Sequence, residues 1–239
     1  MALWTRLPRA EGAVEMLDGP VPLTDLRECL SDVARLNALF GGRFLTLVHV
    51  KRLAAKLPPG RTLTVLDVGT GGGDVPRALV RWARRVGRPI RLFALDRDAA
   101  VARVAIGLGS AYPEIVVLQG DAVDLPVRSG SVDVVISSLT LHHLDEAAAV
   151  RHLAEMDRAA RRGIVVNDLA RSRTAYALVW LLTRVFAKSR MSRHDGPMSV
   201  QRAYVREELR ALCEKAGLFD ARIVRYPPLL RQCVVRGKG

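Results

Sequence analysis

The 239-residue sequence has few of the residues that build disulfide frameworks, structural metal sites or membrane spans. Its three cysteines, Cys29, Cys213 and Cys233, are odd in number and far apart, and none belongs to a Cys-x-x-Cys pair. They predict reduced thiols, and because no secretory signal opens the chain we expect a cytoplasmic protein. The longest apolar run, Ala175 to Val185, is interrupted by Arg184 and is far shorter than the ~20 residues of a spanning helix. The sequence therefore predicts no membrane span, while peripheral association with a membrane stays open.

Acidic residues and lysine are also scarce. The chain has 37 Lys and Arg against 24 Asp and Glu, a formal charge of +13, yet only five of its basic residues are Lys. Such a charge can bind nucleic acid by neutralising phosphates, but most of the arginines are scattered over predicted helices. Residues 171–206 differ, because they contain eight basic residues and a single acid, Asp195. This excess indicates a surface for an anion or for a membrane interface, with a merely solvated helix as the alternative.

What the sequence does have is a glycine-rich stretch, Thr64 to Asp74, which reads Thr-Val-Leu-Asp-Val-Gly-Thr-Gly-Gly-Gly-Asp. Its apolar first half is typical of a buried parallel strand, and its glycines allow a sharp turn that a ligand can approach closely. Asp74 is predicted to cap a following helix that has Pro76 in its first turn. The unit of strand, glycine turn and helix indicates a nucleotide-binding site.

The residues around the glycines narrow the choice of nucleotide. A dinucleotide pattern started at Gly69 needs glycine at position 74, where the chain has Asp74, and no Lys followed by Ser or Thr closes a P-loop. The pattern that remains is Asp67-x-Gly69-x-Gly71-x-Gly73. It resembles the first motif of class I S-adenosylmethionine (SAM)-dependent methyltransferases, in which the glycine turn receives the amino-acid end of the cofactor. An ordinary tight turn is the alternative.

Two more acids follow at the ends of predicted strands. Asp96 closes the strand Ile90 to Asp96, about 20 residues after the glycines, where a carboxylate can accept hydrogen bonds from ribose hydroxyls, as it also does in NAD enzymes. Asp121 follows the strand Ile115 to Gln119; the resemblance implies that it accepts from the adenine amine, and a turn residue is the alternative. The cofactor set that the resemblance implies is Asp67, Gly69, Thr70, Gly71, Gly73, Asp96, Arg97, Asp121, Ala122 and Ser138.

Taken together, the elements predict an α/β fold with a Rossmann-like, doubly wound, seven-stranded and mostly parallel sheet that ends in a C-terminal antiparallel hairpin strand. The fourth and fifth strands are expected at 132–137 and 164–166, and the hairpin at 221–225 and 232–235. Residues 1–58 are expected to form an N-terminal helical cover, of which the first 20 lie along the surface. Residues 59–239 would form the methyltransferase domain, with a helical lid insertion at about 169–204.

The resemblance to the methyltransferases covers roughly residues 60–239. The Leu-His-His-Leu-Asp loop at 141–145 and the insertion are similar to those of methyltransferases that modify quinols, phenols and polyketide-type products. A histidine is a suitable base for a phenolic acceptor, and the candidates are His142, His143 and His194, although packed or exposed structural histidines are the alternative. The predicted substrate-binding residues are Asn37, Tyr176, Trp180, Arg193 and Tyr204, and a structural role for Asn37 stays open.

The sequence thus predicts a methyltransferase that uses SAM to methylate a small, largely apolar acceptor, on the oxygen of a phenolic, quinol or polyketide-type compound. C-methylation of a similar acceptor, a nucleic-acid methyltransferase and a non-catalytic SAM-binding subunit are the alternatives. No metal is expected, since the histidines and cysteines form no ligand set by spacing. The chain is expected to be a monomer or a homodimer.

Overall fold

The computed structural model describes residues 7–238, so that the first six residues of the predicted cover and Gly239 lie outside it. Its seven-stranded sheet has the order β3-β2-β1-β4-β5-β7-β6. Strands β1 to β5 are parallel, whereas β7 runs antiparallel to both β5 and β6. This confirms the predicted doubly wound sheet with its closing hairpin. The strands are β1 Leu63–Val68, β2 Ile90–Asp96, β3 Ile115–Gln119, β4 Val132–Ser138, β5 Ala160–Leu169, β6 Arg222–Tyr226 and β7 Arg231–Gly237.

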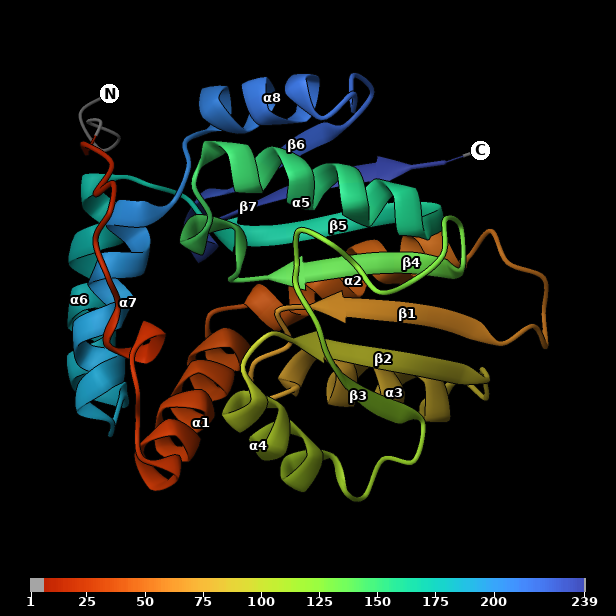
Figure 1. Ribbon diagram of the computed structural model, residues 1–239, viewed down its shortest axis with the longest axis horizontal. Coiled ribbons are helices and arrows are strands. Elements are labelled where there is room, and N and C mark those ends of the chain that lie inside the picture. The colour runs from red at the N-terminus through yellow and green to blue at the C-terminus, as the bar shows by residue number, and fades with distance from the viewer. Residues whose placement is uncertain (1–6, 239) are drawn as a thin grey trace.

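Helices cover both faces of the sheet (Figure 1). One apolar layer packs α2 and α3 against the sheet, and the other packs α5 and α8 against the opposite face. Strand β5 is longer than the predicted 164–166, because its pairing with β4 and β7 continues at both ends. The helices are α1 Leu23–Leu39, α2 Gly42–Ala54, α3 Asp74–Arg85, α4 Ala99–Gly109, α5 Glu146–Ala159, α6 Arg173–Phe186, α7 Arg190–Arg202 and α8 Arg206–Lys215.

The start of α3 differs from the prediction. Gly73, with φ 70°, is the residue that precedes the helix, and Asp74 is already its first residue. Its carboxylate accepts a hydrogen bond from Asn37 Nδ2 at 3.0 Å instead of capping the helix. The predicted cap at Asp74 is therefore wrong, and the residue links the glycine turn to α1. Other acids do cap helices: the Asp98 carboxylate accepts from two backbone N–H groups of α4, and the Asp145 carboxylate accepts from one of α5.

The N-terminal segment divides into two parts with different partners. Helix α2 packs on the sheet beside α3, and its Val50, Leu53 and Ala54 belong to the core of that face. Helix α1 instead packs through Leu26 and Leu30 against α4. Within the described part of the predicted cover, α1 and residues 7–22 therefore lie outside the sheet layers, whereas α2 belongs to one of them.

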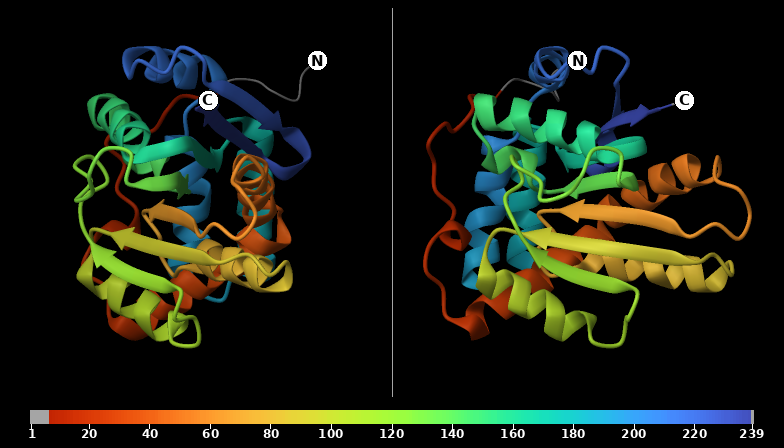
Figure 2. Two further views of the ribbon diagram at one scale, coloured as in Figure 1. Left: turned by 90° about the vertical axis from the view of Figure 1, so that its right-hand side faces the viewer. Right: turned by 45° about the vertical axis from the view of Figure 1, so that its right-hand side comes forward.

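The insertion after β5 forms helices α6 and α7, which pack against each other and against α1. Figure 1 shows them at the end of the sheet to which the arrowheads of β1 and β4 point, and Figure 2 shows the N-terminal segment running along the same end. The predicted lid residues thus lie at the carboxyl edge of the strands, where ligands bind in open parallel sheets. Among residues 7–238, no helix has the length and apolar character needed to cross a membrane.

Candidate active site

Three glycines form the turn between β1 and α3. Gly69, Gly71 and Gly73 have φ values of 72°, 53° and 70°, which glycine adopts without the steric cost of a Cβ. A Cβ on Gly69 would lie 2.3 Å from Oγ1 of Thr140, in the loop after β4. The Gly71 N–H donates to Oδ2 of Asp96 at 3.0 Å. The turn therefore joins the carboxyl ends of β1, β2 and β4 into one surface.

Asp67, the last residue but one of β1, is buried beneath this turn. Its Oδ2 accepts a hydrogen bond from the Thr70 hydroxyl at 2.7 Å, while its buried Oδ1 has no partner among the described residues. Burial raises the pKa of Asp67 to about 7, against the opposing effect of the Thr70 hydrogen bond. An unsatisfied carboxylate oxygen of this kind is ready to receive a cationic or hydrogen-bonding ligand group.

A cavity of about 820 Å³ lies over the ends of β2 and β3. The predicted cofactor residues Asp96, Arg97, Asp121 and Ala122 all line it, together with part of the glycine turn. Asp121 accepts a hydrogen bond from the backbone N–H of Val123 at 3.0 Å, so it also makes the turn contact that was the alternative to adenine binding. The residues predicted to hold the nucleoside are thus brought together, and their individual roles stay predictions.

A second cavity, of about 200 Å³, continues from the glycine turn toward α1 and α6, and we call it the apolar cavity. Gly69, Gly71, Leu139 and both adjacent histidines line the two cavities alike, which makes them neighbouring parts of one site. Leu139 has a φ of 59°, which is uncommon outside glycine, at the point where β4 gives way to the histidine loop. The apolar side chains that line the second cavity include Leu30, Val33, Leu36, Phe40, Val179 and Leu182.

His142 is held between two carboxylates. Its Nδ1 lies 2.8 Å from Oδ1 of Asp168, and its backbone N–H donates to Oδ2 of the same residue at 3.0 Å. Burial alone would raise the pKa of Asp168, but His142, the Leu169 N–H and Arg231 together hold the pKa below its usual value. Asp168 is therefore a carboxylate, so His142 Nδ1 is the donor of this hydrogen bond, and Nε2 is the ring nitrogen that faces Glu15.

Glu15 is the second carboxylate, and sequence reasoning missed it. It lies in the segment expected along the surface, yet it is 3% exposed and its oxygens are 3.7 Å from His142 Nε2 and 3.8 Å from His143 Nε2. Burial raises the pKa of Glu15, and His143 and Arg202 oppose this. The expectation that residues 1–20 lie on the surface is wrong at this position. No local pattern marks Glu15, since its burial depends on contacts with the loop after β4 and with α7.

Glu15, His142 and His143 place one possible ligand atom each within 4.8 Å of one another, a cluster that their spacing in the sequence did not indicate. The Arg202 guanidinium lies 3.5 Å from Glu15 Oε1, so a positive charge already faces this carboxylate. The Ser199 hydroxyl also donates to Glu15 at 3.0 Å. The absence of a metal stays a prediction.

The predicted substrate residues separate into two groups. Asn37 lines the apolar cavity and donates to Asp74, so it combines a structural contact with a place at the site. The other four, and His194, are not among the residues that line either cavity. They instead face solvent or pack elsewhere. The cavity lining therefore gives no support to the substrate roles predicted for Tyr176, Trp180, Arg193 and Tyr204 or to the catalytic role predicted for His194, and these roles stay predictions.

Three of these side chains have partners that sequence alone does not reveal. Trp180 is 42% exposed and lies under the guanidinium of Arg184, 3.8 Å from its ring centroid. Tyr204 donates its hydroxyl to the Leu144 carbonyl at 2.8 Å. His194 does pair with Asp195 at 2.8 Å, as adjacent residues can, but Asp195 also accepts from two backbone N–H groups of the N-terminal segment. This pair therefore fastens α7 to residues 16–17.

Comparison with known proteins decides what kind of site this is. Residues 66–166 match the model of a methyltransferase domain. These residues therefore belong to a methyltransferase domain. The chain is similar to 2-phytyl-1,4-naphtoquinone methyltransferase of Thermosynechococcus vestitus, with 45% identity over 30% of this chain and 29% of that protein. A probable S-adenosylmethionine-dependent methyltransferase of Mycobacterium tuberculosis is 36% identical over 39% of this chain and 31% of its own length.

Solved structures share the fold of this chain. A SAM-dependent methyltransferase from Aquifex aeolicus aligns with 90% of this chain and 98% of its own, with a TM-score of 0.61 and 22% identity. The chain spans under half the length of the curated relatives that it matches. Sequence family and fold together give SAM as the cofactor.

The residues of the site fit this cofactor. The amino-acid end of SAM carries an ammonium and a carboxylate, and the buried atoms of the apolar cavity that have no hydrogen-bond partner among the described residues include Asp67 Oδ1, Ser138 Oγ and Arg231 Nη1. Asp67 would hold the ammonium and Arg231 the carboxylate, while Asp96 would hold the ribose. Arg231, on β7, was missed by sequence reasoning because only the antiparallel pairing with β5 brings it to this edge.

Proposed function

We propose that this methyltransferase transfers a methyl group from SAM to an oxygen of a small, largely apolar acceptor of the phenol, quinol or polyketide type. One observation carries the proposal: an apolar cavity continues from the glycine turn and is lined by His142, which is paired with buried Asp168. SAM supplies the activated methyl group when it is bound. The chain itself has to position the acceptor and remove its proton.

Positioning is the task of the apolar walls. Methyl transfer is an in-line displacement, which is accelerated when the acceptor oxygen is held in line and close to the methyl carbon. Leu30 and Val33 of α1 line the cavity together with Val179 and Leu182 of α6. Such walls favour a flat, apolar acceptor and exclude the water that would compete with it.

Proton removal is the task of His142. Because Asp168 accepts from Nδ1, Nε2 is left to take the acceptor's proton, and the carboxylate then stabilises the imidazolium. A phenol or quinol is a suitable acceptor since its oxygen becomes a better nucleophile as it loses that proton. His143 lies beside His142 with ring centroids 4.2 Å apart and fixes one side of its ring.

Two further observations support this acceptor class. The Thermosynechococcus relative is named for a naphthoquinone acceptor, although the similarity covers less than a third of either chain. The cavity walls also offer apolar carbon and two histidines, without the cluster of exposed basic and aromatic side chains that stacks and neutralises a nucleic-acid strand.

The test is to incubate the purified protein with SAM and, separately, with alkylphenols, hydroquinones, polyketide-type resorcinols and total RNA, and to measure S-adenosylhomocysteine (SAH) formation. Mass spectrometry and NMR of the product then distinguish an O-methyl from a C-methyl group. Gly69→Ala serves as the inactive control. Methylation of RNA alone would contradict the proposal, as would SAH binding without turnover of any acceptor, which is the behaviour of a non-catalytic subunit.

A further inference from the structure

Helix α6 has two apolar faces. Its inner face contributes Val179, Leu182 and Thr183 to the apolar cavity. Its outer face exposes large apolar side chains to solvent, with exposed fractions between 40% and 63%. A water-facing helix surface usually carries polar side chains, and among residues 7–238 nothing covers most of this outer face. We define the outer face of α6 by Leu178, Trp180, Leu181, Val185 and Phe186.

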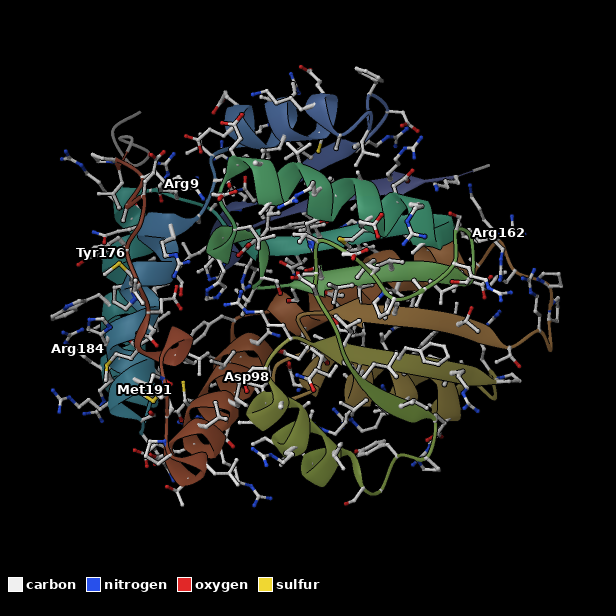
Figure 3. All side chains as sticks on the ribbon, viewed as in Figure 1. Arg9, Asp98, Arg162, Tyr176, Arg184 and Met191 are labelled. Carbon is white, nitrogen blue, oxygen red and sulfur yellow. The ribbon has the colours of Figure 1, made fainter. Side chains whose placement is uncertain are left out.

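Basic side chains surround the outer face. Arg184 lies over the Trp180 ring at 3.8 Å, and Figure 3 shows Arg184 on the outer edge of the α6–α7 pair, away from the sheet. The only acid between residues 171 and 206 is Asp195, which is 6% exposed and bonded to backbone N–H groups. Residues 171–206 therefore present no exposed carboxylate. The exposed basic residues of α6 and α7 and of the link between them are Arg173, Arg184, Lys188, Arg190 and Arg193.

We propose that the outer face of α6 docks on an anionic lipid bilayer. Apolar side chains with a tryptophan among them can enter the interface between headgroups and acyl chains, and flanking arginines and lysines attract the anionic headgroups. A second copy of this chain is a poorer occupant: an isologous contact would bring Arg184 and Lys188 toward their own copies, and the face carries no acid to pair with them.

Docking in this way serves the cavity. Phe186 of the outer face contacts Phe40 with ring centroids 6.0 Å apart, and Phe40 itself lines the cavity. The membrane-facing and the cavity-facing side chains therefore belong to one continuous apolar wall. A lipid-soluble acceptor would pass from the bilayer to the site without crossing water. The inference goes beyond the proposed reaction, and vesicle binding without any acceptor tests it separately.

The experiment is sedimentation of the full chain with vesicles of phosphatidylglycerol or of phosphatidylcholine, without acceptor. We expect binding to phosphatidylglycerol at least tenfold tighter than to phosphatidylcholine, and weakened by 0.5 M salt. Leu181→Ser with Val185→Ser should lower the partition coefficient at least tenfold. Phe219→Ser removes an apolar side chain that is 81% exposed outside this face, and should leave binding unchanged.

Two further variants separate the apolar from the electrostatic contribution. Arg184→Gln should weaken binding to phosphatidylglycerol, whereas Arg85→Gln, on the exposed side of α3, should not. Trp180→Phe should abolish the blue shift of tryptophan emission on vesicle addition. Retained SAH affinity and circular dichroism show that each variant is folded.

Three results would overturn the proposal. The first is no sedimentation with phosphatidylglycerol vesicles at millimolar lipid. The second is an equal loss of binding in the Phe219→Ser control. The third is self-association in ultracentrifugation that Leu181→Ser with Val185→Ser abolishes while vesicle binding is absent, which would assign the face to a second copy.

Discussion

Replacing Asp67 by Asn tests whether the buried carboxylate under the glycine turn is a binding group for the cofactor. The side chain keeps its shape, and its oxygen can still accept from the Thr70 hydroxyl. Burial raises the pKa of Asp67 from 3.8 to about 7 in the folded protein. The carboxyl group therefore exchanges its proton close to neutral pH, where both stability and ligand binding can be measured.

The effect on stability has a definite sign. Between pH 4 and pH 7 the folded protein keeps a proton on Asp67 that the unfolded chain has lost, so the free energy of unfolding falls as pH rises. A shift of about three pKa units at about 1.4 kcal/mol each gives about 4 kcal/mol across this range, after which the contribution levels off. Asp67→Asn should remove this pH dependence and be more stable than wild type near pH 8.

The effect on binding has the opposite direction. If the ammonium of the ligand needs the carboxylate form, about one molecule in eleven is competent at pH 6 and about ten in eleven at pH 8, so wild type should bind SAH about tenfold more tightly at pH 8. Asp67→Asn should bind about 10- to 100-fold more weakly at pH 8, and with little pH dependence, because a hydrogen bond to a charged group contributes about 1.5–3 kcal/mol.

Calorimetric titration with SAH and denaturant unfolding at pH 5 to 8 measure the two effects. Asp133→Asn is the matched control, since Asp133 is 1% exposed but lies at the other end of the strands, where it accepts from the N–H and hydroxyl of Thr64. It should lose stability while keeping the pH dependence of SAH binding. Wild-type affinity in Asp67→Asn at pH 8 would refute the reasoning.

Three other substitutions probe the remaining parts of the site. Gly69→Ala should abolish SAH binding in calorimetry, because the added Cβ would lie 2.3 Å from Thr140 Oγ1 and because alanine disfavours the positive φ of this position. Near-normal affinity would show that the turn can move aside. Arg231→Gln should weaken SAH binding about tenfold or more, but it should leave the binding of an SAH analogue without the carboxylate nearly unchanged. An equal loss of affinity for both ligands would assign Arg231 a structural role. His142→Gln should lower kcat for a phenolic acceptor by about 10²- to 10⁴-fold, with a smaller loss for acceptors that are already ionised at the assay pH. A uniform loss across acceptors of different acidity would exclude His142 as the base.

Local sequence was sufficient for the parts of the fold that depend on local physics. The alternation of apolar strands with helices gave the sheet class, and the strand bounds Ile90–Asp96 and Ile115–Gln119 agree with the structure. The glycine turn was predictable because three closely spaced glycines with positive φ values need no distant partner. Asp67 and Asp96 could be predicted as site residues because each lies at or next to the carboxyl end of its strand, which in a parallel sheet is the ligand edge.

Only the tertiary structure decided which polar groups surround the apolar cavity. Glu15 and Arg231 lie 216 positions apart in the sequence, yet both line this cavity. Glu15 comes from an N-terminal segment that shows no pattern, and Arg231 comes from the antiparallel strand β7. Trp180 was predicted to line the acceptor pocket but is exposed to solvent. The apolar sequence of α6 does not indicate which face of the helix points toward the cavity. The apolar pattern of a strand or helix is a property of local sequence, whereas the direction of a side chain on a largely apolar helix depends on what packs against it.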